Sequence, residues 1–138
     1  GEAVKQAISM IQALTREAQD EFAQVADALQ EALRRFPEGI VAVWYPLTAR
    51  ARADAFLAGV EALGGRPALV VELEIAGESF PLKMKGCGLL VVNPPWKFEE
   101  EARPVIEFLT RTLAQAPGAT GLVEWLVREK AGVPRPPA

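Results

Sequence analysis

The sequence has 138 residues, 50% of them hydrophobic and 24% charged, and a formal net charge of −3. This length and composition predict one compact globular domain and exclude a disordered chain. No histidine is present, which argues against the usual zinc sites, histidine-dependent triads and an imidazole base, so we expect no metal site. The acidic balance argues against a dedicated nucleic-acid-binding module, but it leaves room for a local basic patch.

Cysteine usage and hydropathy indicate the compartment. Cys87 is the single cysteine, which excludes an internal disulfide framework and fits a reducing environment. The longest apolar runs, such as 40–45, are too short to cross a bilayer, and the first residues show no export signal. We therefore expect a cytoplasmic protein with no membrane association.

The first half of the chain predicts a helix, a strand and a second helix. Apolar residues recur at steps of three and four through 2–36, which indicates one long helix. Residues 40–45 form a continuous β-prone run, typical of a strand buried on both faces. Residues 49–63 predict the next helix, which ends at two glycines. The apolar positions of the first helix are Val4, Ile8, Ile11, Ala18, Phe22, Val25 and Leu29.

The second half predicts three more strands and one helix. Strands are expected at 68–75 and 88–92, joined by a turn-rich connection, then a helix at 99–114 and a strand at 121–127. Residues 133–138 form a proline-rich tail with no means of joining a core. The prediction is thus a single α/β domain over residues 1–132, followed by this tail.

The order of these elements predicts the sheet. Strands linked by helices imply right-handed crossovers and a mostly parallel sheet. The pair 68–75 and 88–92 has no helix between its members, so it is expected to be an antiparallel hairpin. A mostly parallel sheet with one antiparallel strand resembles the Rossmann-like methyltransferases, although fold alone does not give function.

One local motif has a chemical interpretation. In amino-methyltransferases a strand ends in Asn or Asp, two prolines and an aromatic residue, which hold a flipped base and its exocyclic amine. Asn93, Pro94 and Trp96 of the turn Asn93-Pro94-Pro95-Trp96 are therefore the catalytic candidates. The alternative is a plain strand terminator. We favour that alternative, because ligands bind beyond the carboxyl ends of parallel strands and an antiparallel strand at 88–92 would end at the opposite edge.

A second candidate site is a basic patch that contacts RNA phosphates. Lys83 and Lys85, with Arg66 and Lys97, supply its charge. Solvated loop charges are the simpler interpretation, given the acidic total.

Several blocks of the sequence together resemble one family, the bacterial methyltransferases that modify N6 of an adenine in large-subunit (23S) ribosomal RNA. Relatives have also been labelled DNA-utilisation proteins. The similarity runs from about residue 17 to residue 129 and corresponds to the C-terminal half of the family's length. The blocks that carry it are Phe36–Ile40, Val43–Leu47, Val71–Leu73, Met84–Trp96 and Val123–Val127.

The resemblance implies a transferase that uses S-adenosylmethionine (AdoMet) and takes ribosomal RNA as its partner. The family's cofactor positions and its catalytic Asp-Pro-Pro-aromatic turn precede the similar region. Residues 1–16 stand in that place and contain no Pro-Pro, no Asp and no Gly-rich loop. We therefore expect residues 1–16 to depart from the family, no AdoMet to bind this chain alone, and the chain alone to be inactive.

Two alternatives remain open beside this half-enzyme. One is a non-enzymatic oligomeric module, natural or engineered, that reuses the half-fold. The other is a minimal methyltransferase that uses Asn93-Pro94-Pro95-Trp96. Because a half-sheet leaves apolar surface and an open edge, we expect the chain to form a homo-oligomer or to associate with a missing N-terminal half.

Overall fold

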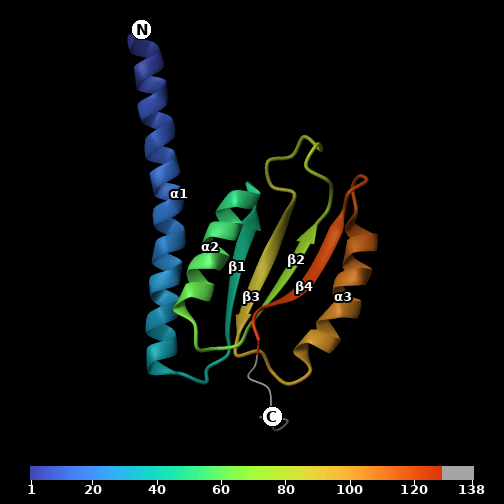
Figure 1. Ribbon diagram of the computed structural model, residues 1–138. Helices are drawn as coiled ribbons and strands as arrows, with labels where there is room; N and C mark the ends of the chain where they lie inside the picture. Colours follow the sequence, from blue (N-terminus) through green and yellow to red (C-terminus); the bar gives the residue numbers. More distant parts are fainter. Residues whose placement is uncertain (129–138) are drawn as a thin grey trace.

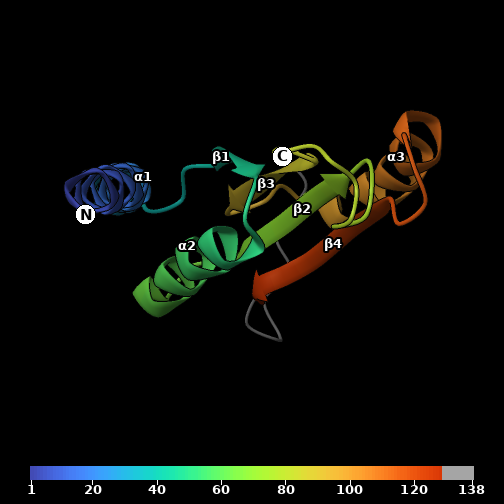
Figure 2. The ribbon, with the colours of Figure 1, turned by 90° about the horizontal axis from the view of Figure 1, so that it is seen from above.

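The protein, seen in a computed structural model, is described over residues 1–128, with the side chains of residues 11–20 left out of the description. The expected tail at 133–138 lies outside the described residues. One sheet lies between α1 and α2 on one face and α3 on the other (Figures 1 and 2). The elements are α1 (Glu2–Arg35), β1 (Val41–Leu47), α2 (Arg50–Leu63), β2 (Ala68–Glu74), β3 (Gly86–Val92), α3 (Phe98–Leu113) and β4 (Thr120–Val127).

The arrangement of the strands corrects the predicted sheet. Their order is β1-β3-β2-β4, and every neighbouring pair is antiparallel. The expectation of a mostly parallel, Rossmann-like sheet is therefore wrong for these residues, whereas the β2–β3 hairpin is confirmed. β1 and β2 do run in the same direction. They do not pair, because β3 returns between them and takes the backbone hydrogen bonds of both.

The main core lies between the sheet and the helices α1 and α2. Phe56 of α2 stands at its centre, with its ring centroid 5.3 Å from that of Phe22 and 5.8 Å from that of Tyr45. Leu29 of α1 and Leu90 of β3 are buried in the same cluster. The alternation of inward and outward residues along the strands puts these apolar side chains on one face of the sheet.

The β1 side of the sheet is less covered than the β4 side. β1 is an edge strand whose pairing partner among residues 1–128 is β3. On the second face, α3 packs against β2 and β4, and Trp44 of β1 is 57% exposed. An open edge beside an exposed tryptophan leaves backbone donors and apolar surface available for another chain segment.

A helix that crosses a bilayer needs about 20 consecutive, mostly apolar residues. Among the described residues, no helix is both long enough and apolar enough to cross a membrane.

Candidate functional site at the carboxyl ends of β1 and β2

The residues singled out from the sequence lie at opposite ends of the sheet. Leu47 and Glu74, the last residues of β1 and β2, both pair with Gly86 at the start of β3. Lys83 and Lys85 lie at this end, where the backbone N–H of Lys85 donates to the carbonyl of Leu47. The four basic residues considered for a phosphate patch are therefore not brought together, because Arg66 precedes β2 and Lys97 follows β3 at the other end.

The Asn-Pro-Pro-Trp turn lies where β3 stops and β2 begins. The N–H of Asn93 donates to the carbonyl of Pro67 (2.8 Å). Its side-chain amide donates to the carbonyls of Pro37 (3.0 Å) and Gly39 (2.9 Å). Asn93 is 2% exposed and has a φ of 54°. Both N–H bonds of this amide are thus used to join the α1–β1 loop to the end of β3.

The aromatic residue of the turn lies in a different environment. Trp96 is 49% exposed, and the ammonium of Lys97 lies 4.5 Å from its ring centroid. This is the geometry of a cation–π contact.

Asn93→Ala is expected to lower the free energy of unfolding by about 2 kcal/mol, because two partly buried hydrogen bonds are lost and alanine disfavours a positive φ. Urea unfolding measures this change. Asn93→Gly is the matched control, since glycine accepts the backbone angle and loses only the amide. A wild-type stability for both variants would show that these hydrogen bonds do not hold the loop.

A buried carboxylate organises the other end of the sheet. Glu72 of β2 is 5% exposed. It accepts a hydrogen bond from the hydroxyl of Tyr45 (2.6 Å) and two from the guanidinium of Arg50 (2.6 and 2.9 Å). Arg50 also donates to Asp54 (2.9 Å) and lies 3.8 Å from Glu74. The carboxylate is therefore fully paired, as a buried charge requires.

Glycine at position 88 makes this network possible. Tyr45 and Glu72 lie on the strands that flank β3, and both pair with Gly88. A Cβ at Gly88 would overlap the Cζ, Cε2 and hydroxyl oxygen of Tyr45. The phenol ring therefore crosses β3 above the bare glycine backbone and reaches the carboxylate on the far strand.

The network changes the ionisation of both Glu72 partners. Burial, followed by the hydrogen bond to Glu72, raises the pKa of Tyr45 well above its ordinary value. The hydrogen bonds to Glu72 raise the pKa of Arg50. Tyr45 therefore stays a neutral donor and Arg50 stays a cation throughout the physiological pH range.

Tyr45 is the only tyrosine in the chain, so tyrosinate absorbance reports this group alone. Its raised pKa stabilises the folded state below the unfolded pKa of about 10, and this stabilisation is lost as the pH rises above that value. We expect no tyrosinate signal near pH 10 in the native chain and ordinary titration in urea. An ordinary titration in the native chain would mean that the phenol is not held by Glu72.

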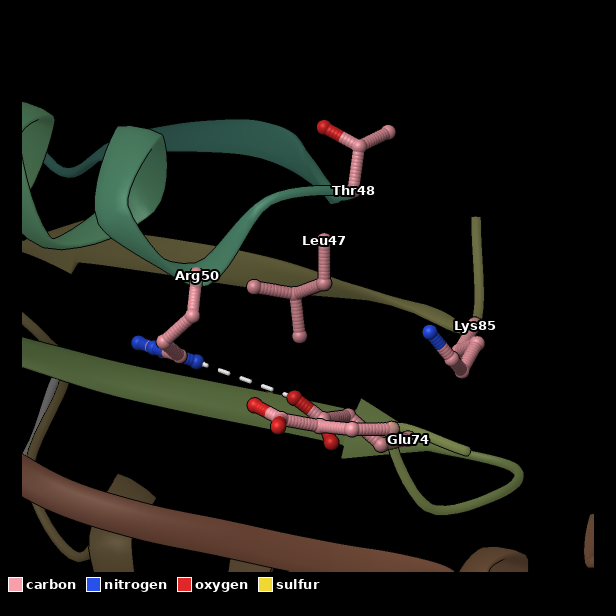
Figure 3. A pocket seen from close by; sticks show the side chains of 6 residues that line it. Leu47, Thr48, Arg50, Glu74 and Lys85 are labelled. Carbon is pink, nitrogen blue, oxygen red and sulfur yellow. Dashed lines mark ion pairs between the residues drawn. The ribbon is translucent and has the colours of Figure 1, made fainter. Parts of the chain in front are cut away.

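A small pocket opens beside this network. Figure 3 shows Arg50 and Lys85 on opposite sides of Leu47, and Glu74 paired with Arg50. With the acids that hold Arg50, the surrounding charge is net negative, which does not favour a phosphate. The pocket is lined by Leu47, Thr48, Arg50, Glu74, Glu78 and Lys85.

The lining of the pocket beside Glu72 does not fit AdoMet. Cofactor pockets are mostly apolar with a few orienting polar groups, whereas the side chains around this pocket are mainly charged. The larger groove between α1 and α2 is lined by apolar side chains with Arg52 as the one charged member. Among the described residues, no group of three or more His, Cys, Asp or Glu side chains is placed to hold a metal ion.

The sequence reasoning missed Glu72, Arg50 and Gly88. A signal was present, because a carboxylate in the middle of the apolar run 68–75 must either face water or find a buried partner. Its partners come from strand and helix positions far away in sequence, which no local pattern connects.

The fold and the site define a layered α–β protein, with helices on both faces of one sheet and an acid–arginine–tyrosine network at one end. The family model described as "Ribosomal RNA large subunit methyltransferase D, RlmJ" matches residues 2–127, so the chain belongs to this family. The match includes most of the segment 1–16, whose departure from the family remains a prediction.

Individual relatives give the same family. The chain is 34% identical over 113 residues to the ribosomal RNA large subunit methyltransferase J of Haemophilus influenzae, and 33% identical to that of Escherichia coli. Each alignment covers 82% of this chain and 40% of the relative. The crystal structure of protein LPL1258 from Legionella pneumophila is similar with a TM-score of 0.66 and 28% identity, over 76% of this chain and 38% of that one.

Proposed function

We propose that this chain is the C-terminal portion of an AdoMet-dependent methyltransferase that acts on N6 of an adenine in ribosomal RNA, and that it is inactive alone. Its family supports the methyltransferase class. The chain spans 40% of the length of its curated relatives. The proposal assigns the cofactor loop and the catalytic Asp-Pro-Pro-aromatic turn to the rest of that length, on the same polypeptide or on a separate one.

The open side of β1 is the observation that carries this proposal. β1 has a free edge among the described residues. Ile40 just before it is 61% exposed and Trp44 within it is 57% exposed. A long apolar edge of this kind is normally covered or paired. We place the remaining part of the enzyme against this edge, where it would continue the sheet and cover Trp44.

In this arrangement the residues of the chain have supporting roles. Tyr45, Glu72 and Arg50 lie at the carboxyl ends of β1 and β2, where open sheets with helical crossovers bind their ligands. We propose that they are positioning residues that fix the edge of the active site, and that Lys83 and Lys85 contact RNA. Asn93 is assigned to loop anchoring, and none of Asn93, Pro94 and Trp96 is assigned to catalysis.

To test this proposal, the part of the relatives' sequence that this chain does not match is produced as a separate polypeptide. Methyl transfer from labelled AdoMet to unmodified large-subunit ribosomal RNA is measured for each part and for the mixture. We expect activity from the mixture alone. Trp44→Glu is expected to weaken association of the two parts at least tenfold, about 1.4 kcal/mol, whereas Trp96→Glu, at the far end of the sheet, leaves it unchanged.

Two results would overturn the proposal. Methylation by residues 1–138 alone would favour a minimal enzyme that uses the Asn93 turn. A mixture that forms a stable complex and still transfers no methyl group would favour a non-enzymatic module. The exposed apolar residues of α1 are the feature that supports this second candidate.

A further inference from the structure

α1 is much longer than the sheet that it covers. Its 34 residues correspond to about 50 Å, whereas a strand of seven residues spans about 23 Å. Phe22 packs against Phe56, and Leu29 further along the helix is buried. Figure 1 shows the N-terminal part of α1 extending beyond the sheet. On that part Val4 is 59% exposed and Ile8 is 50% exposed.

A groove follows the same side of α1 further along the helix. It lies between α1 and α2 and is open to solvent. Most of its lining side chains are alanine or glycine, and a Cβ added at Gly59 would meet no atom within 4 Å. The groove is lined by Phe22, Ala23, Ala26, Ala51, Arg52, Ala55, Phe56 and Gly59.

The exposed apolar residues and the groove lie on the same face of α1. Val4 and Phe22 are eighteen residues apart, and so are Ile8 and Ala26, which is about five turns of 3.6 residues. The projecting residues therefore face the same direction as the α1 wall of the groove. A surface of this kind is complementary to itself when two copies are related by a two-fold axis.

We propose that the projecting part of α1 docks into the α1–α2 groove of a second copy of this chain, with the two α1 helices antiparallel and their axis near residue 15. Val4 of one copy then lies beside Ala26 of the second copy, and Ile8 beside Phe22. Both exposed apolar residues become buried, and the small side chains of the groove let the helices approach closely. This inference does not depend on the proposed methyltransferase function.

The charges along α1 favour a second copy and this direction. Residues 2–16 hold Lys5 and Arg16 with a single acid, Glu2, whereas residues 17–27 hold four acids and no base. An antiparallel pair places the basic part of one helix against the acidic part of the other. A parallel pair would place acid against acid, which is unfavourable. The four acids are Glu17, Asp20, Glu21 and Asp27.

Sedimentation velocity over a concentration series tests the association. We expect the chain to form a dimer that dissociates on dilution. Ile8→Glu should weaken the dimer about 100-fold, as expected for a buried interface anchor. Met10→Glu is the matched control, because Met10 is 66% exposed and lies about a third of a turn away from Val4 and nearly half a turn away from Ile8. A wild-type chain that is monomeric at every concentration overturns the proposal, as does equal weakening by both variants.

The groove is tested separately with Gly59→Arg. A Cβ at Gly59 meets no atom within 4 Å, and the arginine extends into the groove, so circular dichroism should stay native while the dimer is lost. An unchanged dimer would contradict docking in the groove. A monomeric wild-type chain that binds the remainder of the family's length through this groove, with binding lost in Gly59→Arg, would show a different occupant.

Disulfide trapping tests the direction. Chains with Val4→Cys and chains with Ala26→Cys, both in a Cys87→Ala background, are mixed and oxidised. The antiparallel pair predicts cross-links between the two kinds of chain. Cross-links confined to Val4→Cys with Val4→Cys would overturn it.

Discussion

Gly88→Ala is expected to lower the free energy of unfolding by about 3 kcal/mol, the upper range for overpacking of a rigid core. The added methyl group occupies the space of the Tyr45 ring, which lies directly over Gly88. The ring must move, and its hydrogen bond to the buried Glu72 is lost with it. Urea unfolding measures the change in stability, and the ultraviolet titration of Tyr45 should return toward ordinary behaviour in the same variant.

Gly59→Ala is the control for this substitution. Gly59 lies within α2, and a Cβ there meets no atom within 4 Å. Because alanine is the better helix former, this variant should gain up to about 1 kcal/mol. If Gly88→Ala were as stable as the wild type, the tyrosine would not depend on the bare backbone of β3.

Arg50→Met is expected to cost about 3 kcal/mol, the lower end for breaking a buried ion pair, because the arginine side chain is itself 38% exposed. The loss leaves Glu72 buried with Tyr45 as its remaining partner. Glu72→Gln removes the charge that needs the arginine. The double variant Arg50→Met/Glu72→Gln should therefore be more stable than the sum of the two single changes predicts, by about 2 kcal/mol.

A double-mutant cycle from urea unfolding checks this coupling. Arg103→Met provides the comparison, because Arg103 and Glu99 form an ion pair on the surface of α3 and their side chains are 50% and 30% exposed. That exposed pair should contribute less than about 1 kcal/mol. Additive effects of the Arg50 and Glu72 substitutions would mean that the carboxylate does not depend on Arg50.

Local patterns predicted the helices and strands with little error. The spacing of apolar residues in α1, the β-prone run of β1 and the glycines after α2 are signals contained within single segments. The β2–β3 hairpin was also predictable, since its short connection holds no helix. These predictions depend on neighbours in sequence, so one sequence is enough to make them.

The order of the strands depends on distant residues and was predicted wrongly. A helix between β1 and β2 implied a parallel pair, and their common direction agrees with that reasoning. β3 is then inserted between these two strands. The glycine at position 88 is required by this order, because Gly88 lies between Tyr45 and Glu72. A glycine within a β-run is nevertheless compatible with a bulge or an edge, so its meaning emerges only in the folded structure.

The candidate site was predictable only in part. The Asn-Pro-Pro-Trp turn was a visible motif, and the reasoning that a reversed strand would carry it away from the carboxyl ends of β1 and β2 agrees with where the turn lies. The Glu72 network was not visible, because its three members come from β1, α2 and β2. These hydrogen bonds depend on the order of the strands in the sheet, which could not be predicted from the sequence.

Calorimetry with AdoMet shows whether residues 1–138 hold a cofactor site of their own. We expect residues 1–138 alone to give no heat of binding at cofactor concentrations well above those that saturate a complete methyltransferase. We expect binding to appear once a chain with the rest of the relatives' sequence is added. Saturable AdoMet binding by residues 1–138 alone would contradict this expectation.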